Sequence, residues 1–270
     1  MIEGQEGVTW DQWRALAATA EEHGFEAVFR SDHYMSLGDG PNNGSLDAWS
    51  TINALAALTT TIKLGTLVSP GTFRHPSVLA RMATTADHVS GGRIELGMGA
   101  GWHEGEHRAF GFPFDTVKDR FDRYAEQLEI VHRSWHDEPF DFSGRHYTLE
   151  HCDAQPKPVQ KPHPNLILGG SAGPRGAALA ARWADEYNTV GPSEDQAKER
   201  RERVAAACQA AGRDMIVFSA MIRLEGSSSA LVDRLRGLEA AGVERVMLQH
   251  LAHDDLATVE RVGREVIPAV

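Results

Sequence analysis

Hydrophobic positions along the chain follow two periods in turn, and the alternation repeats from one end to the other. Short apolar runs, typical of buried strands, are followed by longer segments whose apolar residues recur every three or four positions, as on one face of a helix. The clearest helical stripe is formed by Val117, Phe121, Tyr124, Leu128, Val131 and Trp135. The predicted strands are "EAVFR" (26–30), "IKLGTLV" (62–68), "RIELGMG" (93–99), "NLILGG" (165–170), "EYNTV" (186–190), "MIVFSAMI" (215–222) and "VERVMLQH" (243–250).

Capping residues mark where several of the predicted helices begin. Thr9 and Gln12 form a T-x-x-Q capping box, and Ser193 with Gln196 forms an S-x-x-Q box. Pro76 suits the first turn of a helix, where its missing N–H has no partner to lose. These signals place helices directly after the predicted strands or the loops that follow them.

Strands and helices in strict alternation favour a parallel sheet. Further helices are expected from about Leu46 and over 177–184, whereas the proline-rich stretch around 139–164 breaks the rhythm and predicts an insertion. If "MIE" at 1–3 is counted as a short strand, the chain contains eight βα units. The prediction is an α/β fold, a (β/α)8 TIM barrel, with residues 1–270 forming a single domain.

Composition narrows the possible partners. The chain has 270 residues and a formal net charge of −11, which argues against nucleic acid or an anionic membrane as a partner. No apolar run approaches the length of a membrane span, and the first residues lack the features of a secretory signal. Only two cysteines are present, Cys152 and Cys208, so a reducing cytoplasmic location is expected.

The second predicted strand ends in an unusual polar group. "AVF" at 27–29 is followed at once by Arg30, Ser31, Asp32 and His33. The last strand also ends in a histidine, His250, and in a barrel of this kind the carboxyl ends of the strands form the active site. We therefore expect Asp32 and His33 at the mouth; the alternative is that Asp32 caps a turn and His33 is solvated.

Three glycine-rich segments follow predicted strands: "GTLVSPGT" (65–72), "GMGAGW" (97–102) and "GGSAGPRG" (169–176). The last opens a helix, where successive backbone N–H groups can bind a phosphate or carboxylate and glycine lets the ligand approach closely. Glycine also serves ordinary turns, so each segment alone is weak evidence. "GMGAGW" lacks the third glycine of a dinucleotide-binding motif, which argues against a Rossmann fold.

The segment "HEGEH" at 103–107 matches the H-E-x-x-H pattern of zinc peptidases. That chemistry needs both imidazoles on one face of a regular helix, whereas Gly105 and the glycines before it predict a loop. We expect that no zinc binds here and that His103 and His107 line the mouth or brace the loop. No G-x-S-x-G elbow is present, and neither cysteine is placed like a nucleophile.

Several of these segments together resemble the luciferase-like monooxygenase superfamily. They are "FRSDHY", the run from "IKLGTLVSPGTFRHP" through "GMGAGWHEGEHRAFGFPF", and "LILGGSAGPRGAALAARWADEYNT". The similarity covers nearly the whole chain in order. It is greatest to the branch that uses the deazaflavin coenzyme F420, toward which the Ser-Asp-His sequence points.

The resemblance implies that the coenzyme lies across the carboxyl ends of the barrel strands. It makes His33 the proton donor or acceptor beside hydride transfer, and it implies a bulge with a non-prolyl cis peptide bond at Leu67–Val68. Imidazole suits a proton-transfer role near neutral pH. The implied coenzyme contacts are Asp32, Leu67, Val68, Ala100, Gly101, Trp102, Gly169, Gly170, Ser171 and Gly173.

The chain departs from the family pattern at two places. Trp102 stands where F420-dependent sugar-phosphate dehydrogenases have a glutamate, so a sugar phosphate is not the expected substrate, and the first strand is very short. The prediction is an F420-dependent oxidoreductase acting on a small organic substrate, with a homodimer left open. The alternatives are an FMN-dependent monooxygenase on the same barrel, a zinc hydrolase, and a non-catalytic barrel that binds flavin or phosphate.

Overall fold

The computed structural model describes residues 1–38 and 40–270, and a seven-stranded parallel sheet forms its centre. The sheet order is β1-β2-β3-β6-β7-β8-β9, so strands that follow one another along the chain lie side by side. The strands are β1 (Ala27–Arg30), β2 (Lys63–Pro70), β3 (Ile94–Gly99), β6 (Asn165–Gly169), β7 (Glu186–Val190), β8 (Val217–Arg223) and β9 (Arg245–Gln249). This arrangement confirms the predicted parallel α/β barrel.

The eighth strand position is reduced to a pair of bridges at Ile2. This residue pairs in parallel with Arg30 at the end of β1 and with His250 just after β9. The Ile2 N–H donates to the carbonyl of Phe29 at 2.9 Å, and the His250 N–H donates to the carbonyl of Met1 at 2.9 Å. The short "MIE" segment thus closes the sheet between its two edge strands, as expected from the sequence.

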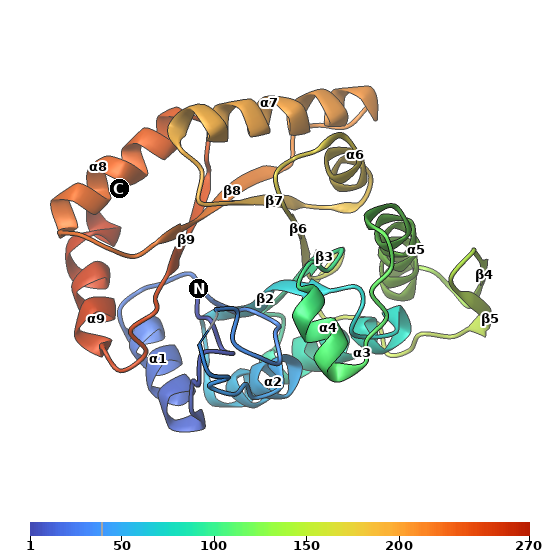
Figure 1. Cartoon of the computed structure of the whole chain (residues 1–270), viewed down its shortest axis with the longest axis horizontal. Helices are drawn as coiled ribbons and strands as arrows, with labels where there is room; N and C mark the ends of the chain where they lie inside the picture. The colour runs from blue at the N-terminus through green and yellow to red at the C-terminus, as the bar shows by residue number, and fades with distance from the viewer. Residues whose placement is uncertain (39) are drawn as a thin grey trace.

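Helices surround the sheet on the outside, with their axes arranged around the ring of strands (Figure 1). None of the helices in the described ranges has both the length and the apolar character that a bilayer span requires. The helices are α1 (Trp10–Glu22), α2 (Ala48–Leu58), α3 (Pro76–Ser90), α4 (Glu104–Phe110), α5 (Val117–His136), α6 (Pro174–Trp183), α7 (Glu194–Ala210), α8 (Ser228–Ala240), α9 (Leu256–Glu265) and the 3-10 turn η1 (Ile267–Ala269).

The capping signals placed the helix starts well where they were present. Both capping boxes form, at the starts of α1 and α7, and Pro76 is the first residue of α3. Without such a box, the predicted starts shift: α2 begins at Ala48 rather than Leu46, because Asp47 is its N-cap. Helix α6 begins at Pro174, three residues before the predicted start, because Gly173 is the N-cap.

The expected insertion around 139–164 lies outside the barrel. It contains an antiparallel hairpin of β4 (Phe140–Ser143) and β5 (Thr148–Cys152), which projects beyond α5 (Figure 1). The hairpin itself was not predicted, since its strands are short and largely exposed and so lack a clear apolar alternation. The segment returns to the barrel through two cis X-Pro bonds, at Pro156 and Pro162.

The prediction of a loop at "HEGEH" was wrong, because residues Glu104–Phe110 form the short helix α4. His103 is its N-cap, so Gly105 falls in the first turn, where backbone N–H groups have no intrahelical partner and glycine costs little. The helix ends at Gly111, whose left-handed φ of 70° suits a C-cap. Glycines 97, 99 and 101 all precede the helix and do not interrupt it.

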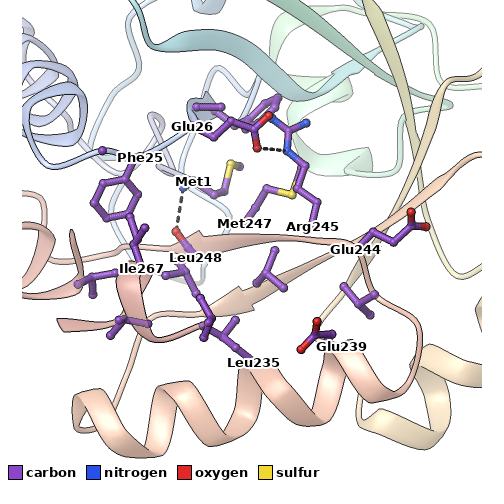
Figure 2. Close-up of a pocket in the computed structure, with 18 of the residues that line it drawn as sticks. Met1, Phe25, Glu26, Leu235, Glu239, Glu244, Arg245, Met247, Leu248 and Ile267 are labelled. Carbon is purple, nitrogen blue, oxygen red and sulfur yellow. Dashed lines mark hydrogen bonds and ion pairs between the residues drawn. The ribbon is translucent and has the colours of Figure 1, made fainter. Parts of the chain in front are cut away.

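A cavity of about 700 Å³ lies between the edge strands, away from the residues expected at the mouth. Figure 2 shows it bordered by β9, by Phe25 and Glu26 ahead of β1, by α8 and by the C-terminal segment. Arg245 crosses it to Glu26 at 3.0 Å, and the Met1 amine donates to the carbonyl of Leu248 at 2.8 Å. None of the predicted site residues lines this cavity, so the candidate active site lies elsewhere.

Candidate active site

The polar group after β1 brings an imidazole against a buried carboxylate. Nδ1 of His33 lies 2.7 Å from Oε2 of Glu106, whose side chain is completely buried. The other carboxylate oxygen accepts the backbone N–H of Tyr34. Glu106 lies on α4, the short helix that follows β3, so its hydrogen bonds join this helix to His33 and Tyr34 after β1.

The Glu106 carboxylate determines how the His33 ring is oriented and protonated. Burial alone would raise the pKa of Glu106, but the hydrogen bond from His33 and the N–H of Tyr34 lower it below its ordinary value. An ionised carboxylate only accepts, so Nδ1 of His33 must carry a proton. Nε2 is therefore the ring nitrogen that can exchange a proton with a ligand, and the ring packs edge-on against Trp102 at a centroid distance of 5.9 Å.

Asp32 lies beside this pair but is engaged by residues of the protein itself. Its side chain is 1% exposed and receives both terminal nitrogens of Arg74, at 2.6 and 3.1 Å, and the hydroxyl of Ser69 at 2.6 Å. Burial alone would lower the pKa of Arg74, but the charge of Asp32 and its hydrogen bonds raise it instead. Asp32 thus ties the end of β1 to the end of β2, and its expected contact with a coenzyme stays a prediction.

The end of β2 carries the backbone feature that the family resemblance implied. The peptide bond Leu67–Val68 is cis, and the pairing of β2 with β3 shifts register between Thr66 and Ser69. Both the non-prolyl cis bond and the bulge are confirmed. Leu67 is nearly buried at 9% exposure, whereas Val68 is partly exposed.

The Val68 side chain explains several of the glycines that surround it. A Cβ on Gly99 would lie 2.7 Å from one methyl of Val68. A Cβ on Gly97 would clash with the carbonyl oxygen of Thr66 and lie 3.0 Å from the other methyl of Val68. On the neighbouring strand β6, a Cβ on Gly169 would lie 3.4 Å from the Val68 methyl that faces Gly97. The glycines on β3 therefore make room for the bulged end of β2, the Thr66 backbone at Gly97 and Val68 at Gly99, a packing role that the sequence pattern alone did not separate from ligand approach.

The glycine-rich segment after β6 borders a cavity of about 390 Å³. Gly173 is the N-cap of α6 and provides no side-chain cap, and a Cβ placed on it would meet nothing within 4 Å. The approach to the helix N-terminus is therefore free of side chains at Gly173, as an anion site requires, and because Pro174 has no N–H the first helical donor is the N–H of Arg175. Five of the sequence-predicted residues line this one cavity: Ala100, Gly169, Gly170, Ser171 and Gly173.

Part of the expected phosphate nest is already used inside the protein. The N–H of Gly170 donates to the carbonyl of Asn188 at 3.0 Å, and that of Ala172 donates to the hydroxyl of Tyr187 at 2.8 Å. Arg175 turns away to Asp122 on α5, at 2.5 Å. The donors left for a ligand are accordingly those at the start of α6.

The two histidines of "HEGEH" have different surroundings. Nδ1 of His107 donates to the carbonyl of His103 at 2.7 Å, and Nε2 lies 2.6 Å from the hydroxyl of Thr72. His107 therefore braces helix α4 against the segment after β2, in place of the loop expected for it, and both of its nitrogens are occupied. His103 is the N-cap, with its ring 6.3 Å from that of His33. The expectation that no zinc binds here stays a prediction.

These groups come from four strands that are neighbours in the sheet, β1, β2, β3 and β6. Trp102, which is 62% exposed, follows Gly101, whose φ of 79° is left-handed. Sequence reasoning missed the ion-pair role of Arg74 and the hydrogen bond of Ser69, because no spacing signal links them to Asp32. The pairing of Glu106 with His33 was also missed, although the quoted run "GMGAGWHEGEHRAFGFPF" contains this glutamate.

Comparison with known proteins identifies relatives of two kinds. The chain is 32% identical over 211 residues, 77% of its length, to the FMNH(2)-dependent dimethylsulfone monooxygenase of Pseudomonas putida, of which the match covers 57%. It is 36% identical over 177 residues, 65% of its length, to the F420-dependent glucose-6-phosphate dehydrogenase of Nakamurella multipartita, of which the match covers 50%. The chain thus spans about half the length of these curated relatives.

Solved structures share the fold over the whole chain. An F420-dependent secondary alcohol dehydrogenase in complex with an F420-acetone adduct superposes with a TM-score of 0.87 at 20% identity, covering 100% of this chain and 98% of the other. The family model described as "Luciferase-like monooxygenase" matches residues 2–225. Because that match covers most of the chain, the protein belongs to the luciferase-like monooxygenase family.

Proposed function

We propose that the protein is an oxidoreductase that uses the deazaflavin coenzyme F420 and exchanges a hydride with a small organic substrate. The observation that carries the proposal is the His33–Glu106 pair, in which a buried carboxylate holds an imidazole just after the carboxyl end of β1. The F420-dependent relatives and structural neighbours support it. The cis peptide at Leu67–Val68 agrees with the backing that the family provides for the coenzyme ring.

The cavity beside α6 fits a coenzyme that carries phosphate. Its helix N-terminus has no side-chain cap, and Gly173 leaves the approach open. In this proposal, the start of α6 with Gly169, Gly170 and Ser171 holds the phosphate end. Ala100, Gly101 and Trp102, together with Leu67 and Val68, border the ring, and Asp32 keeps the ends of β1 and β2 in place.

When it is bound, the coenzyme supplies the carbon that gives or accepts hydride, while the protein provides binding, orientation and a proton. Glu106 fixes the Nδ1 proton of His33, so Nε2 faces the substrate. In substrate oxidation Nε2 accepts a proton from the substrate, and in reduction it returns one. The exposed indole of Trp102 packs beside His33 and covers that side of the mouth.

The dimethylsulfone monooxygenase relative favours FMN as the second candidate coenzyme. Titration of the purified protein with F420 and with FMN, followed by absorbance and fluorescence, separates the two proposals. We expect the tighter binding for F420, and preferential binding of FMN would favour the monooxygenase. A protein that binds neither coenzyme and whose stoichiometric zinc is lost in His103→Ala together with activity would instead support the hydrolase, and a barrel that binds coenzyme without turnover would be non-catalytic.

Gly173→Val tests the phosphate end of the site. The backbone of Gly173 has φ −61°, which any residue adopts, and its Cβ would point into open space, so the fold should be unaffected. Binding of F420 should weaken by tenfold or more, while the melting temperature stays within about 2 °C of the wild type. Gly170→Val is less informative, because φ at Gly170 is 151° and a Cβ would lie 3.1 Å from the Tyr187 hydroxyl. Unchanged F420 affinity in Gly173→Val would remove the start of α6 from the site.

His33→Ala tests the proton-transfer role. We expect coenzyme affinity to persist and turnover to fall by roughly 10²-fold or more, the usual contribution of general acid–base catalysis. Equal turnover in the variant would contradict the assignment.

The proposal has three further parts: residues 1–270 act as one barrel domain, the protein forms a homodimer, and it is located in the cytoplasm. Light scattering of the purified protein tests the dimer.

A further inference from the structure

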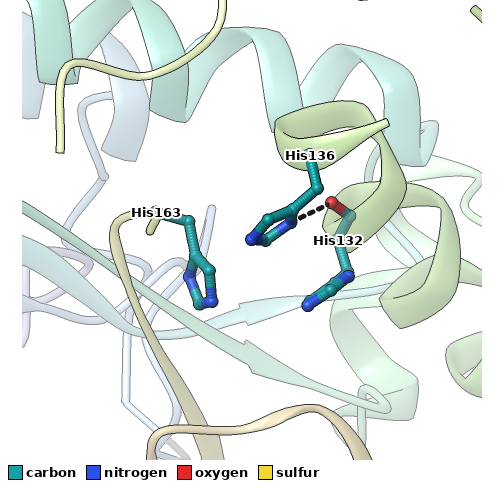
Figure 3. A group of neighbouring side chains, drawn as sticks. All are labelled: His132, His136 and His163. Carbon is teal, nitrogen blue, oxygen red and sulfur yellow. Dashed lines mark hydrogen bonds between the residues drawn. The ribbon is translucent and has the colours of Figure 1, made fainter. Parts of the chain in front are cut away.

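Three histidines gather on the outside of the barrel, apart from the candidate active site. His132 and His136 lie one turn apart in the last turns of α5, and His163 comes from the segment that leads into β6 (Figure 3). One ring nitrogen from each lies within 4.8 Å of the others. Since β6 begins at Asn165 and ends at Gly169, the cluster is at the amino end of β6 and the proposed phosphate site at its carboxyl end.

Hydrogen bonds to the backbone fix the orientation of two of these rings. Nδ1 of His136 lies 2.8 Å from the carbonyl of His132, and Nδ1 of His163 lies 2.8 Å from the carbonyl of Pro164. A carbonyl only accepts, so both Nδ1 atoms carry the proton and both Nε2 atoms bear a free lone pair. Metal-binding histidines usually donate their other ring N–H to a backbone carbonyl or carboxylate in this way, which fixes the tautomer and the orientation of the ligand nitrogen.

The surroundings keep the cluster available for a cation. The ring of His132 is half-buried and packs against that of Trp183, with ring centroids 5.1 Å apart. The His163 side chain is 8% exposed, whereas His136 is exposed and leaves one side open to water. Trp135 stacks on His163 with ring centroids 5.6 Å apart, which holds that ring toward α5.

We propose that His132, His136 and His163 bind one divalent transition-metal ion, Zn²⁺ or a cation of similar preference, with water as the fourth ligand. Imidazole nitrogens suit Zn²⁺, Ni²⁺, Cu²⁺ and Co²⁺ better than Mg²⁺ or Ca²⁺. Tetrahedral zinc with Zn–N bonds of about 2.0–2.1 Å holds its ligand nitrogens about 3.4 Å apart. Binding would therefore draw the three nitrogens together from within 4.8 Å and turn the rings of His132 and His136, which now stack with centroids 4.1 Å apart. The ion would join the end of α5 to the chain entering β6, a structural role that does not depend on the proposed function.

The experiment is a titration of the chelator-treated protein with Zn²⁺ alone, followed by calorimetry and by thermal unfolding. We expect about one equivalent per chain and a melting temperature raised by roughly 5–10 °C at a hundredfold excess over Kd. Co²⁺ in place of Zn²⁺ should give the visible absorption of a tetrahedral site. No stoichiometric binding at micromolar Zn²⁺ would overturn the proposal.

Three variants locate the ion. His136→Ala removes an exposed ligand, so the metal-free protein should melt as the wild type does, while zinc affinity falls at least tenfold. His23→Ala is the matched control, because Nδ1 of His23 also bonds the carbonyl four residues earlier, at 2.9 Å, but belongs to no histidine cluster in the described residues. Zinc binding that survives His136→Ala, or that is lost in His103→Ala instead, would contradict the proposed site.

Discussion

Glu106→Gln is the perturbation that isolates the proton-transfer role of His33 most directly. The wild-type carboxylate accepts two donors, Nδ1 of His33 on one oxygen and the backbone N–H of Tyr34 on the other. A glutamine has only one acceptor oxygen, and its other terminal atom is an amide nitrogen. If that oxygen stays with Tyr34, the amide must donate to Nδ1 of His33, and the imidazole proton moves to Nε2.

The size of the effect follows from the hydrogen bond that is lost. A charge-assisted hydrogen bond contributes about 1.5–3 kcal/mol, and each 1.4 kcal/mol corresponds to a tenfold change in rate. We therefore expect Glu106→Gln to lower turnover by roughly 10- to 150-fold, less than or equal to the effect of His33→Ala. Glu104→Gln is the control, since Glu104 lies on the same helix but is 62% exposed and pairs with Arg108.

The assay is steady-state turnover with the bound coenzyme, made in the single variants and in the double variant His33→Ala/Glu106→Gln. If Glu106 acts through His33, the glutamine should have little further effect once His33 is gone. Nitrogen chemical shifts of the labelled histidine should report the change of tautomer independently of activity. Wild-type turnover in Glu106→Gln, or an equal loss with and without His33, would refute the reasoning.

Two further predictions concern stability. Arg74→Met should lower the free energy of unfolding by about 3–5 kcal/mol, because it leaves the Asp32 carboxylate buried without the guanidinium that pairs with it. Chemical denaturation measures this loss, and adding Asp32→Asn to the Arg74→Met variant should recover part of it. Although burial raises the pKa of Glu21, three successive N–H groups at 60–62 lower it to about 2. The stabilisation is thus present above about pH 4.5 and lost as the pH falls through 2. The Glu21 side chain is partly buried, and Glu21→Gln should cost about 1 kcal/mol at pH 7. A gap that is undiminished at pH 2 would contradict this.

The order of the elements was predictable because strand and helix periods differ so clearly in this chain. The position of His33 at the mouth followed from the same pattern, since the carboxyl ends of parallel strands share one face. The ion pair of Asp32 with Arg74 was not predictable, because it joins two strand ends through a side chain that no periodicity marks. Helix α4 was missed because the glycines before it were taken as part of the helix rather than as its approach.

The histidine clusters illustrate why a motif needs its structural context. "HEGEH" matches a zinc pattern, yet both ring nitrogens of His107 are occupied by the protein. The pair at 132 and 136 has the same spacing and lies on a regular helix with a strong apolar stripe. Its third partner, His163, is reached only through the insertion, so no local pattern could have joined the three.

The barrel closes where the site requires support. Ile2 forms its bridges at the carboxyl end of β1. There the Ile2 carbonyl accepts the N–H of Ser31 at 3.1 Å, and the N–H of Gly4 donates to the Ser31 hydroxyl at 3.0 Å. Asp32 and His33 follow directly. The cavity between the edge strands lies toward their amino ends, which in such barrels contribute to stability rather than catalysis. The short strand segment at Ile2 is therefore sufficient, because it and β2 together fix the backbone on both sides of β1, from which Asp32 and His33 follow.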